Sequence, residues 1–299
     1  YLDVMEVIGM EIFGKNIKLF LLDGTPTGRW ICELSNWTGV AYKIPRSMIK
    51  VCENRIELLS SGVYFLFGED DKENKPLVYI GEAENIMTRL KQHLDSKDYW
   101  NEVIVFISKD DNLNKAYIKY LENRFYELAI AAKRYVVKNA NTPTRSNISE
   151  AEQAEMEEFL YNAKLLISTL GHKTFEPLLT EKQIEDKENL FVLNFTCTAG
   201  TGGSALGKVT DEGFVVLQGS YINPITRSSL YKGAVVLREK LKKDNKINDE
   251  NKLMEDVLFG TPSGASCLVL GRSSNGLTEW KTKEGKTLKE IEKEDIKNG

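Results

Sequence analysis

Two short apolar segments separated by a charged turn place the strongest constraint on how this chain folds. Strand character is clear in Gly62–Phe67 and again in Leu77–Gly81, because both are rich in β-branched and aromatic residues. Charged and polar residues fill Glu69–Asn74 between them, as expected of a turn. The pattern predicts a β-hairpin with Tyr64 and Tyr79 on adjacent strands.

Helical and strand patterns continue after this hairpin. Asn85 is placed to cap a helix whose apolar face carries Met87, Leu90 and Leu94. Further along, the sequence predicts a strand, a long helix and a short strand, over Val103–Ile107, Leu113–Ala132 and Tyr135–Val137. We therefore expect residues 58–147 to form a compact α/β unit, with a mixed or antiparallel three-stranded sheet flanked by helices.

The flanking segments predict three more regions and an overall α+β class. Residues 1–57 are expected to be a β-rich lead-in with a hairpin at Ile17–Leu34. Its favoured role is to cover one face of the next domain, and the alternative is that it reads the substrate. Residues 148–190 are expected to be a helical connector whose first helix is capped by Ser149. Residues 191–299 are expected to be an α+β C-terminal domain, with strands at Phe191–Phe195 and Gly213–Ser220.

Composition narrows the class of protein. Apolar content is 41% and charged content 28%, which is ordinary for a globular protein, and no run approaches the roughly 18 apolar residues of a membrane span. The four cysteines are dispersed, which predicts buried free thiols in a reducing cytoplasm rather than a disulfide framework or a zinc site. A net charge of −4 is unusual for a nucleic-acid binder, although a whole-chain sum can hide a local basic patch.

Five side chains in and after the hairpin are of the types that phosphodiester hydrolysis requires. Arg89 can contact phosphate oxygens, and His93, four positions later on the same helical face, can relay a proton. A carboxylate such as Glu122 can hold a divalent ion whose other ligands are water and phosphate. Tyr64 or Tyr79 could act as a base if a nearby cation lowers the pKa of its phenol. Each residue alone has an ordinary structural interpretation, and it is their joint spacing that favours a site.

These residues resemble the GIY-YIG nuclease superfamily. Gly62-Val63-Tyr64 is similar to the first family motif, with Val in place of Ile, and Tyr79-Ile80-Gly81 matches the second without change. Arg89, His93 and Glu122 are similar to the arginine, histidine and metal-binding glutamate of certain members. The C-terminal segment resembles a domain of unknown function appended to bacterial members, on the residues Gly271–Gly276, Trp280 and Lys281.

The resemblance implies a metal-dependent endonuclease that acts on DNA in repair, restriction or defence. In that case a motif tyrosine activates water, with Tyr64 ranked slightly above Tyr79, Arg89 binds phosphate, and Glu122 holds Mg²⁺ or Mn²⁺. The family also carries an asparagine after the glutamate helix, and both Asn139 and Asn141 qualify for that role.

Two other functions stay open at this point. One is a nucleic-acid-binding module with an inactive site, whose contact surface would be the basic segment Arg238, Lys240, Lys242, Lys243 and Lys246. The other is a protein-interaction scaffold that docks a partner through its C-terminal domain. Neither involves a membrane.

Overall fold

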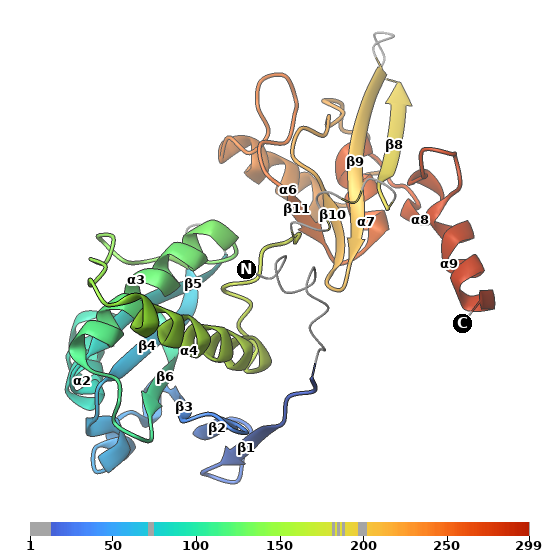
Figure 1. Ribbon diagram of the computed structural model, residues 1–299. Helices are drawn as coiled ribbons and strands as arrows, with labels where there is room; N and C mark the ends of the chain where they lie inside the picture. The colour runs from blue at the N-terminus through green and yellow to red at the C-terminus, as the bar shows by residue number, and fades with distance from the viewer. Residues whose placement is uncertain are drawn as a thin grey trace. The chain divides into compact units, whose positions relative to one another are not determined.

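The structure, a computed structural model, describes residues 13–70, 75–180, 183, 186, 189–196 and 202–298. The chain divides into two compact units, Tyr1–Pro177 and Leu178–Gly299. The predicted α+β class is confirmed, because the described residues form seven α-helices and two β-sheets (Figure 1). The expected boundaries at residues 57 and 147 both fall inside the first unit. Of the charged turn, residues 71–74 lie outside the described residues.

A seven-stranded mixed sheet organises the first unit. Its strand order is β1-β2-β3-β6-β4-β5-β7, and every neighbouring pair is antiparallel except β5 and β7. The strands are β1 (Ile17–Leu21), β2 (Trp30–Leu34), β3 (Gly39–Pro45), β4 (Gly62–Asp70), β5 (Lys75–Ala83), β6 (Trp100–Ser108) and β7 (Val136–Val137). The predicted hairpin is confirmed as β4 and β5, with Tyr64 opposite Gly81 and Leu66 opposite Tyr79.

The expectation of a three-stranded sheet was wrong, because the N-terminal strands join the same sheet. All seven residues of β3 pair with β6, from Gly39 opposite Ser108 to Pro45 opposite Glu102. Strands β1 to β3 therefore extend the sheet sideways, where a layer over one of its faces had been expected. The short 3₁₀ turns between residues 46 and 59 do pack on a face of the sheet, through the buried Ile49, Cys52 and Leu58.

Helices cover both faces of this sheet. One core lies under α3 (Lys115–Ala132) and α4 (Glu150–Thr169) and receives Val63, Phe65 and Phe67 from β4. The opposite core lies under α2 (Ile86–Ser96) and receives the alternating residues Tyr64 and Leu66. The period of two along β4 thus sends the motif tyrosine toward α2.

The helix ends confirm the sequence signals. The Asn85 side chain accepts a hydrogen bond from the Thr88 amide at 2.9 Å, which fixes the start of α2. Ser149 and Glu152 form a reciprocal capping box at the start of α4. Because α4 packs on α3 and on strands β2 and β3, it is part of the first unit rather than a separate connector.

The second unit has an antiparallel sheet of order β11-β10-β9-β8. Its strands are β8 (Phe191–Thr196), β9 (Gly202–Thr210), β10 (Gly213–Val216) and β11 (Val257–Phe259), and its helices are α6 (Lys232–Lys243), α7 (Pro262–Leu270), α8 (Gly276–Glu279) and α9 (Leu288–Asn298). The predicted strand at Gly213–Ser220 is shorter than expected and ends at Val216, whereas β9 and α7 were not predicted at all. The core of the second unit includes Phe214 and Trp280, whose ring centroids lie 4.6 Å apart.

Candidate active site

The two halves of the hairpin motif meet in one contact. Tyr64 of β4 lies opposite Gly81 of β5, and a Cβ atom at position 81 would overlap the Tyr64 phenol. Glycine at this position therefore lets the buried Tyr64 ring lie flat across the neighbouring strand. The last residue of the second motif is thus explained by the tyrosine of the first.

Two predicted site residues, His93 and Arg89, converge on the Tyr64 hydroxyl. Its oxygen lies 2.7 Å from His93 Nε2, and Arg89 Nε donates to it at 3.3 Å. Both partners come from α2, one turn apart, so a single helix face delivers them to the strand. Arg89 is further oriented by a hydrogen bond from Nη1 to Gln92 Oε1 at 3.0 Å.

Burial controls protonation within this group. Tyr64 is fully buried and His93 is 2% exposed. Burial, followed by the neighbouring Tyr79, raises the pKa of the Tyr64 phenol far above its usual value. Burial, and then the positive charges of Arg89 and Lys97, lowers the pKa of His93 to about 4. At neutral pH the imidazole is therefore uncharged and the phenol keeps its proton.

The second motif tyrosine sits beside the first but is half-buried rather than buried. The centroid of the Tyr79 ring lies 6.3 Å from that of Tyr64 and 5.3 Å from that of His93. The Lys97 ammonium lies over the Tyr79 ring, 4.3 Å from its centroid. Lys97 was not identified from the sequence, because it follows the helix end and no motif position marks it.

Glu122 of α3 interacts electrostatically with Tyr64 and Arg89. Burial raises the pKa of this carboxyl to about 7, with a further contribution from the charge of Glu82. A hydrogen bond from the Glu82 backbone amide and the charges of Arg89 and Lys119 act in the opposite direction. The charge of Glu122 in turn raises the pKa of Tyr64. Glu82 follows Gly81 directly in β5, so its place beside Glu122 depends on strand register, which the sequence did not reveal.

The residues around Glu122 have the donor chemistry of a hard divalent cation. Glu122 and Glu82 supply carboxylate oxygens whose negative charges repel each other, and a cation would relieve this repulsion. Among the described residues no cluster of three or more His, Cys, Asp or Glu side chains is arranged to hold a metal. Mg²⁺ is commonly held by one or two carboxylates with water in its other positions, so the pair fits such an ion.

The two candidate asparagines have different surroundings. Asn139 accepts a hydrogen bond from the Ile80 amide at 3.0 Å and donates to the Ile80 carbonyl at 2.7 Å. Its side chain thereby continues the pairing of β5 beyond the end of β7 and supports the strand that carries Tyr79. Asn141 is exposed, and none of the described residues hydrogen-bonds its side chain.

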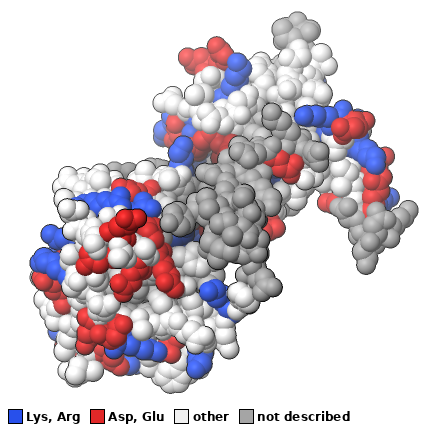
Figure 2. All heavy atoms as spheres, viewed as in Figure 1, with Lys and Arg blue, Asp and Glu red and all other residues white. Residues whose placement is uncertain are grey.

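The expected basic contact surface in the second unit was partly wrong. Arg238 is only 3% exposed and donates to the carbonyls of Leu268 and Asn223. Lys246 forms an ion pair with Glu255 at 2.6 Å. On the face seen in Figure 2, Lys and Arg side chains are interspersed with Asp and Glu. Lys242 and Lys243 are the exposed members of the predicted surface.

No helix within the described ranges has the length and apolar character needed to cross a bilayer.

Comparison with known families gives one match, in which the model of a domain of unknown function, DUF4357, fits residues 195–292. This match lies within the second unit. No curated protein and no solved structure matches the chain.

Proposed function

We propose that this protein is a metal-dependent endonuclease of the GIY-YIG type that hydrolyses DNA phosphodiester bonds. The observation that carries the proposal is the convergence of His93 and Arg89 on the Tyr64 hydroxyl, at 2.7 and 3.3 Å. Tyrosine, histidine and arginine brought together within electrostatic range of a carboxylate of raised pKa form an arrangement suited to proton transfer at a phosphate.

Arg89 is the phosphate-binding residue in this proposal. Its Nε and Nη1 groups are engaged by Tyr64 and Gln92, which fixes the plane of the guanidinium. The remaining N–H groups can donate to phosphate oxygens and stabilise the negative charge that develops during hydrolysis.

His93 is the proton acceptor for the tyrosine. In the tautomer that carries its proton on Nδ1, Nε2 accepts a hydrogen bond from the Tyr64 O–H. Because Tyr64 holds its proton at neutral pH, it needs such a neutral base before its oxygen can take a proton from water. The half-buried Tyr79 is the more accessible of the two phenols and is the alternative base.

Glu122, with Glu82 beside it, would hold Mg²⁺ or Mn²⁺. When bound, the cation would neutralise charge on the scissile phosphate and acidify a bound water. We assign the activity to the cytoplasm, because the described cysteines, Cys32, Cys52 and Cys267, are buried free thiols. Repair, restriction and defence remain the biological settings that suit a DNA endonuclease.

The direct test is cleavage of supercoiled plasmid with Mg²⁺ or Mn²⁺ and with a chelator. Glu122→Gln and Arg89→Gln should each lower cleavage by about a hundredfold or more. Glu127→Gln is the matched control, because this glutamate lies on the same helix but pairs with Arg124 on the surface. Cleavage that survives in both site variants would overturn the proposal. Salt-dependent DNA binding without cleavage by the unaltered protein would instead favour an inactive binding module.

A further inference from the structure

The second unit contains a cavity of about 270 Å³ that plays no part in the proposed active site. Its wall carries two guanidinium groups, Arg227 and Arg272, and one carboxylate, Glu279. The uncharged residues of the lining are Asn194, Phe195, Thr196, Asn223 and Leu270. A polar cavity with an excess of positive charge is suited to an anionic ligand.

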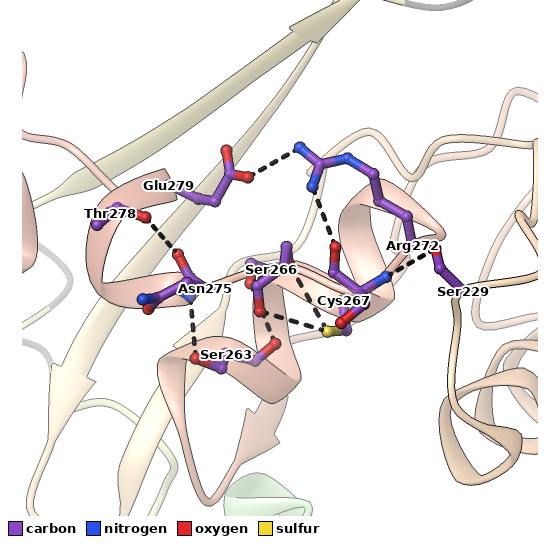
Figure 3. Close-up of polar contacts among 11 residues, drawn as sticks. Ser229, Ser263, Ser266, Cys267, Arg272, Asn275, Thr278 and Glu279 are labelled. Carbon is purple, nitrogen blue, oxygen red and sulfur yellow. Dashed lines mark hydrogen bonds and ion pairs between the residues drawn. The ribbon is translucent and has the colours of Figure 1, made fainter.

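Arg272 is held in this wall by a braced loop. Its Nη2 group pairs with Glu279 at 2.8 Å, and Nη1 donates to the Ser273 carbonyl at 3.1 Å (Figure 3). The next residues are tied to α7 by a 2.6 Å contact between the hydroxyls of Ser274 and Ser266. Asn275 then caps α8. The segment Gly271–Gly276, which carries the C-terminal motif, therefore serves to position Arg272.

A second segment of the lining, which carries Asn223 and Arg227, is fixed to the end of α7. The Asn223 amide donates to the Val269 carbonyl and the Arg227 amide to the Gly271 carbonyl, both at 2.8 Å. The buried Arg238 links the same two segments through its hydrogen bonds to Leu268 and Asn223. This backbone framework holds Arg227 at the rim, and among the described residues the Arg227 side chain has no hydrogen bond or ion pair.

We propose that this cavity binds one nucleotide unit of a single-stranded nucleic acid. Arg227 would be the principal phosphate contact, because it is exposed and its guanidinium has no partner among the described residues, and Arg272 would be the second. Phe195 is a partly exposed residue of the lining. Its ring, which also packs against Gly203 and Tyr221, offers a surface on which a base can stack. The side-chain amides of Asn194 and Asn223 also line the cavity and can hydrogen-bond to base edges.

The size of the cavity and the position of the ring favour a single strand over a duplex. A volume of about 270 Å³ is at the small end of ligand sites, so it admits one small unit of a polymer. A base can reach a ring in a cavity wall only when it is unpaired and unstacked. The choice of nucleic acid as the ligand rests on the proposed function, whereas the anion-binding chemistry does not.

The test is binding of a short fluorescent oligothymidylate to the full chain in chelator, measured by anisotropy. Arg227→Gln should weaken binding about tenfold, and Arg227→Lys should weaken it less. Phe195→Leu retains an apolar side chain but removes the stacking surface, so about fivefold weaker binding is expected. Lys243→Gln is the control, because it removes one exposed positive charge from the same unit and should change affinity less than about twofold.

Three results would overturn the inference. One is an Arg227→Gln protein that binds the oligonucleotide as the Lys243→Gln protein does, with both folded by thermal melting. Another is thymidine monophosphate competing as well as the oligonucleotide, which would indicate a free nucleotide rather than a strand. The last is an acidic peptide that binds as tightly as the oligonucleotide and depends on Arg227, which would identify a protein partner.

The binding assay is independent of cleavage. It is carried out without metal and can be repeated with the Glu122→Gln protein. Binding that depends on Arg227 in a protein that never cuts DNA would refute the nuclease and leave the cavity assignment intact. Metal-dependent cutting by a protein whose oligonucleotide binding does not depend on Arg227 would refute the cavity assignment and leave the nuclease intact.

Discussion

The two histidines of this chain lie in opposite kinds of surroundings. His172 Nε2 donates to Glu102 at 2.6 Å, and its Nδ1 accepts from the Tyr135 hydroxyl at 3.4 Å. Its ring stacks on Phe67, and Lys43 completes the group through an ion pair with Glu102 at 3.2 Å. Among the described residues, the His93 side chain has one hydrogen-bond partner, Tyr64, and its buried Nδ1 has none.

This difference separates a structural polar cluster from a candidate catalytic one. In the His172 cluster the imidazole, the carboxylate and the ammonium are all satisfied, so the cluster attaches the residues after α4 to strands β3 and β6. In the His93 group burial displaces the pKa of both the imidazole and the phenol, and within the described part of the chain the imidazole Nδ1 has no hydrogen-bond partner. A buried polar group without a hydrogen-bond partner lowers the stability of the fold, so its presence here favours a functional role for the group over a structural one.

The largest expected effect is on catalysis. We expect His93→Phe to lower metal-dependent plasmid cleavage by about 10²- to 10⁴-fold, because the proton acceptor for Tyr64 is lost while an aromatic ring still fills the space. His172→Phe should change cleavage less than about twofold per folded molecule. Single-turnover cleavage, normalised to the folded fraction, measures both. Equal losses in the two variants would remove the contrast between the sites.

The next effect is on the pH dependence of stability. The pKa of His93 falls from 6.5 to about 4 on folding, so below pH 6.5 the unfolded chain binds a proton that the folded chain does not. The contribution is complete above pH 6.5 and is lost as the pH falls toward 4, by up to about 3 kcal/mol. Urea unfolding across this window should therefore show a decline that His93→Phe reduces. A decline of the same size in that variant would contradict the lowered pKa.

The His172 cluster should respond most to loss of its carboxylate. Glu102→Ala leaves Lys43 and His172 without their shared acceptor, and we expect the free energy of unfolding to fall by about 1–3 kcal/mol at pH 7. The exposed pair of Glu53 and Lys91 is the comparison, and Glu53→Ala should cost less than about 1 kcal/mol. Chemical denaturation measures both, and equal costs would show that the cluster is no more than a surface ion pair.

The smallest effect should come from Tyr135→Phe. This change removes one long hydrogen bond to His172, so less than about 1 kcal/mol of stability should be lost and cleavage should not change. The same chemical change in the other cluster, Tyr64→Phe, should lower cleavage strongly. Thermal melts and cleavage assays on the two variants compare the hydroxyls directly. A cleavage defect in Tyr135→Phe would show that the two clusters are coupled.

The sequence predicted elements whose signals are local. The strands of the motif hairpin, the Asn85 cap and the Ser149 capping box all depend on residues close together in the chain, and all are present. Strand β9 was missed because glycines replace apolar residues in it. The rings of Phe195 and Tyr221 lie against Gly203, and that of Phe214 lies against Gly207, which explains these glycines but could not be foreseen.

Helix α7 was missed for a related reason. Residues Ala265 to Leu270 are all buried, so this helix has no amphipathic pattern to detect. Only its Thr261 cap and Pro262 at the first turn were readable from the sequence. In the candidate site, motif spacing located the residues of α2, whereas Glu82 and Lys97 depend on register and on the path of the chain after the helix.

The pairing of β3 with β6 has a practical consequence for anyone who isolates the motif region. A fragment that begins at residue 58 would leave β6 as an open edge, with the amides and carbonyls that now pair with β3 unsatisfied over a stretch that contains Val103–Ile107. An uncovered apolar edge of this kind readily adds strands from other molecules. Such a fragment should aggregate in a concentration-dependent way. The shortest fragment that stays in solution should include the strands from Ile17 onward.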